Sequence, residues 1–395
     1  MRLMLVLFLE LAVLFWNCGT QAAAEVSDGE SSSVQQEDTT SGWMEELEEI
    51  SGLLDLERID QEISELPGNT EFSFADTFQK LLHGEIPFDI KELPGMLVRM
   101  FLSELEQQRR MALQILIIVL ASAIFSNFIR VFNSSQIADI SFYMMYLLIC
   151  GLLIHSFMAM NQIVLDTCSQ INSFMKILLP VYVGAVVLCA GSISALGFYE
   201  VTLLGINLTQ NLVIRMVLPV INFYLVLLIL NQMSEEDYFS RFADLLEMGV
   251  GWVLKTVTGL VVGLQAVQCL VTPSVDALKS TSLQRLAKAI PGIGGLLDSA
   301  AETVGACALV IKNAAGTAGI LALLLICMLP LVKLAVCIFI FRLLCAFIQP
   351  VSERRMVEGI GSISRSAVLL LKILVMNVSV FVISIAMVTS SVKGG

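Results

Sequence analysis

Polar residues and glycines gather in residues 276–319, within the apolar part of the chain that follows residue 111. The candidate functional residues are Asp276, Lys279, Pro291, Gly294, Lys312, Asn313, Gly316, Gly319 and, further along, Pro330. Glycines near proline allow broken helices and close backbone approach, as in transport and channel proteins. Gly316 and Gly319 also permit tight helix packing in lipid. We interpret the stretch as an assembly or pore-lining element, with ordinary helix packing as the simpler explanation of the glycines.

Catalytic, cofactor-binding and metal-ligating patterns are absent from the sequence. There is no G-x-x-x-x-G-K-[ST] phosphate-binding loop and no H-E-x-x-H pair, and the two histidines, His83 and His155, fall in different regions. The nine cysteines show no C-x-x-C or zinc-type spacing, and eight lie over or beside apolar segments as small hydrophobic residues. We predict no catalytic residue, no metal and no cofactor, and therefore a protein that is not an enzyme.

Four further polar side chains fall in or near apolar segments: His155, Lys255, Arg215 and Lys372. Such residues can form a proton relay or a substrate path. The simpler interpretation, which we favour, is an interhelical hydrogen bond for His155 and snorkelling to the membrane surface for Arg215 and Lys372.

The composition is that of a membrane protein: 56% of residues are hydrophobic, 15% are charged and the mean hydropathy is +0.83. The net charge of −12 is unevenly distributed. Residues 25–111 hold 21 acidic and 6 basic residues, whereas the remainder after residue 111 holds 13 acidic and 16 basic ones. No basic stripe with interleaved aromatic residues points to nucleic acid.

Residues 1–24 have the form of a signal peptide, with Arg2, an apolar core over residues 3–16, and three alanines before residue 25. We predict a cleavable signal, with an uncleaved anchor as the alternative. Residues 25–110 are then an acidic extracytoplasmic region with a disordered start, and residues 111–395 are a polytopic membrane domain.

The acidic region ends in short amphipathic segments. One of them carries Phe74, Phe78, Leu81 and Leu82 at helical spacing and stops at Gly84. Such helices are too few to build a core of their own, so we expect them to lie on the membrane or to dock onto a partner.

The membrane domain is predicted to be all-α, with about eight transmembrane helices. The expected spans are residues 112–132, 140–160, 173–196, 212–230, 248–271, 314–329, 331–348 and 367–388. The sixth and seventh form a hairpin that turns at Leu329-Pro330. As one straight helix, residues 314–348 would extend roughly 52 Å, against a hydrocarbon core of about 30 Å, and proline removes a backbone donor. The hairpin predicts that Gly316 and Gln349 lie on the same side of the membrane.

Charge distribution gives the expected orientation. With the acidic region outside, the cytosolic loops between these eight spans hold nine basic residues and the outer ends hold four, in agreement with the excess of positive charge on the cytoplasmic side. Arg99, Arg109 and Arg110 before the first span oppose this assignment.

Several short stretches, in this order and spacing, carry a resemblance to a known family. They are Leu178–Gly184 (LLPVYVG), Val217–Pro219, Asp276…Lys279…Pro291-x-x-Gly294, Lys312-Asn313-x-x-Gly316-x-x-Gly319, Met328–Pro330 and Gln349-Pro350. The chain after the leader resembles stage III sporulation protein AE of endospore-forming bacteria. It departs from the family at Gln349, where an acidic residue is usual.

The resemblance implies a multi-pass protein of the mother-cell membrane around the forespore. It would belong to a secretion-like channel complex, with a secretion-type ATPase and ring-forming proteins, that sustains forespore development after engulfment. No catalytic residues are carried over from the family, and self-association as a homo-oligomer stays open. The alternatives are a secondary transporter or permease for a small solute, for which we find no convincing internal repeat, and a membrane scaffold without a pore.

Overall fold

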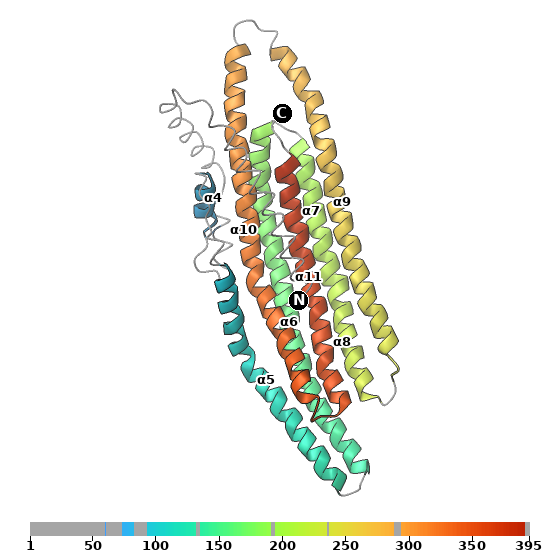
Figure 1. The fold of residues 1–395 in the computed structure, drawn as a ribbon. Coiled ribbons are helices and arrows are strands. Elements are labelled where there is room, and N and C mark those ends of the chain that lie inside the picture. The colour runs from blue at the N-terminus through green and yellow to red at the C-terminus, as the bar shows by residue number, and fades with distance from the viewer. Residues whose placement is uncertain are drawn as a thin grey trace. The chain divides into compact units, whose positions relative to one another are not determined.

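The computed structural model describes residue 60 and residues 73–82, 93–131, 135–190, 194–234, 237–287 and 294–391 (Figure 1). Within these ranges all regular structure is helical. The helices are α4 (Phe74–Leu82), α5 (Leu93–Val131), α6 (Ser135–Ala190), α7 (Ser194–Leu212), α8 (Leu218–Met233), α9 (Ser240–Ala287), α10 (Gly294–Ile348) and α11 (Arg354–Ser391). A five-residue π-helical turn, η1 (Val213–Val217), joins α7 to α8 without a break.

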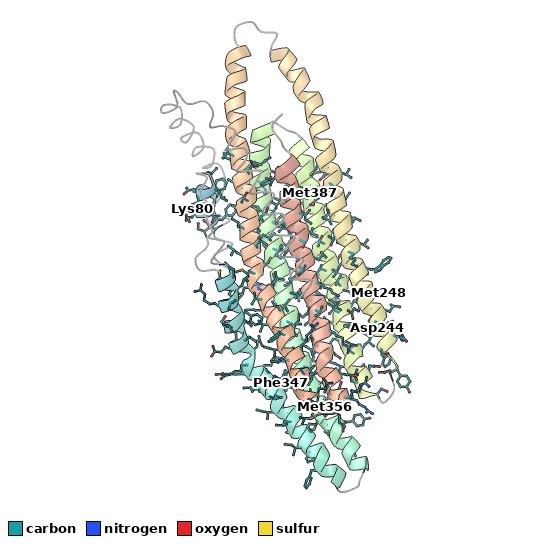
Figure 2. All side chains as sticks on the ribbon, viewed as in Figure 1. Lys80, Asp244, Met248, Phe347, Met356 and Met387 are labelled. Atoms are coloured by element: carbon teal, nitrogen blue, oxygen red, sulfur yellow. The ribbon has the colours of Figure 1, made fainter. Side chains whose placement is uncertain are left out.

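Helix α11 is the centre of the bundle. It packs against α6, α8, α9 and α10, whereas α5 lies along α6 and α10 (Figure 1). The most apolar window of α11 is 67% buried and that of α5 is only 22% buried. Large apolar side chains are exposed, among them Met248 of α9 and Phe347 of α10, both labelled in Figure 2. This is the distribution expected of a helical bundle that faces lipid.

Six helices in the described part of the chain are long and apolar enough to cross a membrane. They cover Pro94–Phe125, Tyr143–Gly184, Tyr199–Met233, Ser240–Cys269, Val310–Ile348 and Arg354–Met387. The prediction of an all-helical, multi-pass membrane protein is thus confirmed. The expected division into eight spans is not what the helices show, because the predicted second span and most of the third lie in α6, and the sixth and seventh both lie in α10.

The predicted hairpin at Leu329-Pro330 is wrong, since α10 continues through Pro330 as one 55-residue helix. Both halves pack against other helices: a Cβ at Gly319, before the proline, would lie 2.7 Å from Leu178 Cδ2 of α6, and Phe101 of α5 packs against Phe339, after the proline, with ring centroids 6.0 Å apart. Packing along the bundle outweighs the loss of one backbone hydrogen bond. The length argument failed because an apolar helix covered by other helices need not end at the hydrocarbon boundary.

Continuity of α6 and α10 also changes the charge argument for orientation. With six crossings, the connection between α9 and α10 lies on the same side of the membrane as the start of α5. Lys279 and Arg285 of α9, which the eight-span arrangement assigned to the cytosol, are then on the same side as the start of α5. The nine-to-four count no longer supports an extracytoplasmic acidic region, and that prediction depends on the leader alone.

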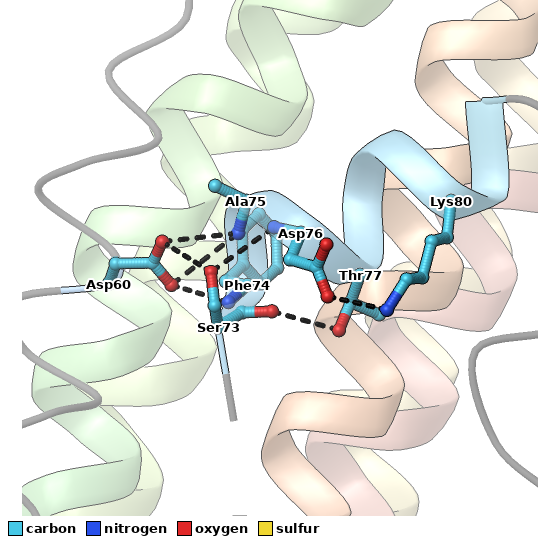
Figure 3. Close-up of polar contacts among 7 residues, drawn as sticks. All are labelled: Asp60, Ser73, Phe74, Ala75, Asp76, Thr77 and Lys80. Carbon is cyan, nitrogen blue, oxygen red and sulfur yellow. Dashed lines mark hydrogen bonds and ion pairs between the residues drawn. The ribbon is translucent and has the colours of Figure 1, made fainter. Parts of the chain in front are cut away.

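The predicted amphipathic helix of the acidic region is present as α4, which packs against α10. Figure 3 shows how its start is fixed: the Asp60 carboxylate accepts hydrogen bonds from the Phe74 and Ala75 amides and from Ser73 Oγ (2.9 Å). Ser73 Oγ in turn accepts from the Asp76 amide at 3.1 Å. These bonds satisfy free donors of the first turn. Phe74 and Phe78 are fully buried, so α4 docks onto its own chain.

The six-span arrangement makes a specific topological prediction. Single cysteines at Ser32 and Ser282 should react with an impermeant thiol reagent from one side of the membrane, and a cysteine at Gln349 should react from the other. The parent protein gives the background of native cysteines, and Ala318→Cys, at a buried position of α10, should react only after denaturation. The eight-span arrangement requires the opposite pairing, with Ser282 and Gln349 on one side.

Candidate functional site at the junction of α6, α10 and α11

The small residues of the candidate stretch lie where α10 meets α6 and α11. Between Ile311 and Gly319 the chain reads IKNAAGTAG, and Ala315 and Ala318 have no exposed surface. Because these side chains hardly extend beyond the backbone, neighbouring helices approach α10 closely. In lipid, van der Waals packing of this kind is a main source of helix association.

Lys312 is the charged residue of this junction and is only 1% exposed. Its Nζ donates a hydrogen bond of 2.9 Å to the backbone carbonyl of Thr389. Helix α11 ends at Ser391, so this carbonyl is one of the last four carbonyls of the helix, for which no N–H donor is available within the helix. A positive charge at a helix C-terminus also interacts favourably with the negative end of the helix dipole. Lys312 thus caps α11 from a different helix.

The Thr389 hydroxyl joins the third helix to the junction. Its Oγ1 donates to the Ile385 carbonyl at 2.8 Å and lies 3.0 Å from the Tyr182 hydroxyl of α6. Since the single hydroxyl proton of Thr389 is used within α11, Tyr182 is the donor to Thr389. One threonine therefore connects to α10 through its carbonyl and to α6 through its side chain.

Gly316 and Gly319 are the positions where the helices come closest. A Cβ at Gly316 would lie 2.6 Å from Thr389 Oγ1 and 3.3 Å from Tyr182 Cε2, and a Cβ at Gly319 would lie 2.7 Å from Leu178 Cδ2. At Gly319 the obstacle is the flexible end of a leucine, whereas at Gly316 it is a hydroxyl held by two hydrogen bonds. Glycine is therefore required more strictly at position 316.

The remaining candidate residues are placed as follows. Asn313 is half-buried and its carbonyl accepts from Thr317 Oγ1 at 2.9 Å, and Pro330 lies within α10. Gly294 is the first residue of α10, and Asp276 and Lys279 lie on α9. Pro291 and the side chains of Asp276 and Lys279 are outside the described residues. The structure thus brings together Lys312, Gly316 and Gly319 inside one protomer, and a role of the whole set in assembly or a pore stays a prediction.

Sequence analysis did not identify the residues that the glycines and Lys312 contact. Two of them, Leu178 and Tyr182, belong to the LLPVYVG stretch that carries the family resemblance, so two stretches of that resemblance pack against each other. Thr389 gave no signal, because a lone threonine near the end of an apolar segment is common. Only the three-dimensional arrangement shows that these residues meet.

Further buried polar contacts tie α6 and α9 to α11. Gln265 Nε2 donates to Ser384 Oγ at 2.7 Å, while Ser384 Oγ donates to the Val380 carbonyl at 2.6 Å, and Asn377 Nδ2 donates to Cys168 Sγ at 3.4 Å. Hydrogen bonds of this kind between transmembrane helices contribute on the order of 0.6–2 kcal/mol. They orient α11 in the bundle and are a second set of residues that sequence analysis missed.

The other polar residues that the sequence singled out lie away from the junction. His155, Arg215 and Lys255 are exposed, and Lys372 is half-buried. The exposed position of His155 differs from the interhelical hydrogen bond that we favoured. In the described residues no three histidine, cysteine, aspartate or glutamate side chains gather closely enough to hold a metal ion.

Comparison with known proteins gives two matches. The family model for stage III sporulation protein AE (spore_III_AE) matches residues 72–392, which include α4 to α11. The chain is similar to stage III sporulation protein AE of Bacillus subtilis (strain 168), with 24% identity over 263 residues. That alignment covers 66% of this chain and 65% of the relative, slightly less than two thirds of its length. No solved structure matches.

The glycine geometry predicts a graded effect of alanine substitution. Gly316→Ala should lower stability by about 1–3 kcal/mol, the usual cost of overpacking, and Gly319→Ala should cost less because Leu178 can move. Thermal unfolding of the purified protein in detergent measures both. The control is Gly249→Ala on α9, where a Cβ meets nothing within 4 Å and the better helix propensity of alanine should leave stability equal or slightly higher. Equal losses in all three variants would contradict the close-packing account.

The cap provided by Lys312 predicts a local effect. Lys312→Met should leave the end of α11 without its charge-assisted bond, at a cost of about 1.5–3 kcal/mol. Hydrogen–deuterium exchange in the last turn of α11 should rise, while exchange in the middle of α11 changes little. Lys255→Met is the matched control, because Lys255 is exposed on α9. Unchanged exchange at the end of α11 in Lys312→Met would show that the bond does not hold that end.

Proposed function

Because this chain belongs to the stage III sporulation protein AE family, we propose that it is an integral membrane component of the channel complex between mother cell and forespore. The observation that carries the proposal is the extent of the family match, which runs from residue 72 to residue 392 and includes every candidate membrane span. The chain is a multi-pass sporulation membrane protein. Its place in a secretion-like complex, in the mother-cell membrane around the forespore, is the proposed part.

The arrangement of polar groups supports a role without catalysis. At the junction, the Lys312 ammonium and the hydroxyls of Tyr182 and Thr389 are engaged with a carbonyl or with each other. Groups held in this way stabilise helix contacts, and none of these bonds pairs a nucleophile with a base. The protein accordingly serves as a membrane platform for the proteins that supply energy and structure.

The described connections between helices are short, so little of the chain projects on the side of the α8–α9 and α10–α11 connections. The α10–α11 connection is only residues 349–353, and the α8–α9 connection is residues 234–239. Longer helical segments are found instead at the other end, where α9 continues to Ala287 and α10 begins at Gly294. These segments are the surface that we assign to ring-forming partners, with a secretion-type ATPase as the proposed source of energy.

Affinity purification from membranes of sporulating cells tests the proposal. The tagged protein should recover a secretion-type ATPase and ring-forming proteins, and a deletion strain should fail in forespore development after engulfment. Gly316→Leu, which blocks the closest helix contact, should still insert into membranes but lose these partners and reduce spore formation at least tenfold. Gly249→Ala should behave like the parent.

Two results of this experiment would contradict the proposal. Recovery of the protein alone, from a strain in which it is needed for sporulation, would favour a secondary transporter for a small solute. Normal spore formation by the deletion strain would exclude a required component of the channel.

A further inference from the structure

Helix α6 carries a polar stripe on its outward face. The stripe, named here the α6 stripe, consists of exposed side chains within the candidate span Tyr143–Gly184: His155, Gln162, Asp166, Ser169, Ser173 and Lys176. At 100° per residue these positions fall in a sector of about 80° on one side of the helix. Met158, 63% exposed, lies in the same sector between His155 and Gln162, so the uninterrupted polar part runs from Gln162 to Lys176 and extends roughly 21 Å, against about 30 Å for a hydrocarbon core.

The depth of the stripe follows from two contacts on α11. Asn377 bonds Cys168 of α6, and Ser384, seven residues or about 10 Å further along, bonds Gln265 of α9. Because α9 and α11 run in the same direction, position 258 of α9 is level with Cys168. Helix α6 runs in that direction as well (Figure 1), so Asp166, two residues before Cys168, is level with position 256 of α9.

The outward face of α9 is less polar than the α6 stripe over this length. Level with Asp166 it exposes Lys255 and Thr256, and about one turn or more away it exposes Trp252, Leu260 and Leu264, which are 72%, 49% and 43% exposed. On α6 itself, the same face is apolar at Met144 and Leu148. The α6 stripe therefore exposes charges of both signs with amide and hydroxyl groups, whereas α9 exposes one charge among larger apolar side chains.

Lipid is an unfavourable environment for the α6 stripe. An aspartate or lysine at the centre of a membrane helix costs about 2.5–3.5 kcal/mol on insertion scales. Gln162 donates a 2.7 Å hydrogen bond to Asp166, which stabilises the carboxylate without neutralising its charge. The stripe therefore requires water or a polar protein surface along most of its length.

We propose that the α6 stripe lines an aqueous path enclosed by several copies of this chain, which rests on the proposed channel function and supplies its path. Copies inserted in one membrane share one orientation, so a closed symmetric arrangement places each residue level with the same residue of its neighbours. Asp166 then faces Asp166, and Lys176 faces Lys176. Like charges exclude a dry contact, so the stripes surround water. Such rings of charge are the means by which pores act on ions, and the solutes that fit this path are small, hydrated and polar.

The test uses the full chain, reconstituted in phospholipid vesicles, with single cysteines introduced along α6 and α9. The probe is a small, charged methanethiosulfonate reagent, and mass spectrometry assigns each modified site against the native cysteines. Gln162→Cys, Ser169→Cys and Ser173→Cys should react at least tenfold faster than Leu260→Cys and Leu264→Cys on α9. Cross-linking in the same vesicles should yield oligomers of the chain.

The two charges of the stripe give a second readout. Ser169→Cys lies one turn from Asp166 and should react several-fold faster with a cationic than with an anionic reagent, whereas Ser173→Cys, one turn from Lys176, should show a lower ratio. Asp166→Asn should reduce the ratio at Ser169→Cys without changing the oligomers. If Asp166→Asn left the ratio of cationic to anionic reaction rates at Ser169→Cys unchanged, the carboxylate would not face the path.

Each other outcome overturns the inference in a distinct way. Stripe cysteines as slow as Leu260→Cys would mean that lipid or a dry protein contact covers α6. Fast stripe cysteines on a chain that cross-links only as a monomer would mean that one copy forms the aqueous crevice by itself. Co-purified channel proteins with an unreactive stripe would leave the proposed function standing and remove only this path. A reactive stripe on an oligomeric chain that recovers no channel proteins would support the aqueous path and contradict the proposed function.

Discussion

The close approach of α10 to α6 and α11 depends on the absence of side-chain volume between Ile311 and Gly319. Where Gly316 faces Thr389 and Tyr182, the space for a Cβ is already occupied by a hydroxyl at 2.6 Å. That proximity allows the Lys312 ammonium to reach the Thr389 carbonyl and the Tyr182 hydroxyl to reach Thr389 Oγ1. In lipid there is no hydrophobic force between helices to replace these contacts. The position of α11, and with it the core of the bundle, follows from this one constraint.

Buried and exposed polar side chains of this protomer have different environments. Inside the bundle, Gln265 is bonded to Ser384 and Lys312 is bonded to a helix end, so burial is compensated by hydrogen bonds. On the outside, the α6 stripe carries charges of both signs, whereas α9 exposes Lys255 among tryptophan and leucine side chains at a similar depth. A protomer alone in lipid would therefore leave the charges of its α6 face in an unfavourable environment. This is the physical reason to expect further protein or water beside α6.

Much of the fold could be predicted from the sequence, because hydropathy and helical spacing are local properties. The membrane class, the all-helical fold and the amphipathic helix at Phe74 and Phe78 follow from the pattern of side chains alone. The ends of the helices could not be predicted from this pattern. A polar stretch at residues 161–172 was interpreted as a connection between two spans, yet it forms the middle of α6, where its polar residues share faces of a continuous helix.

The proline at position 330 shows why the rest lay beyond a single sequence. A proline inside a helix costs about 3 kcal/mol in isolation, and this local cost predicted a turn. The cost of a turn is non-local: a hairpin at Pro330 would remove either the contacts of Gly319 with Leu178 or those of Phe339 with Phe101. The same limitation applies to the candidate site, where the glycines could be identified by type but Thr389, 73 residues after Gly316, could not. Residues of this kind are specified by helix packing, so a sequence pattern reveals that an interface exists before it reveals what lies across it.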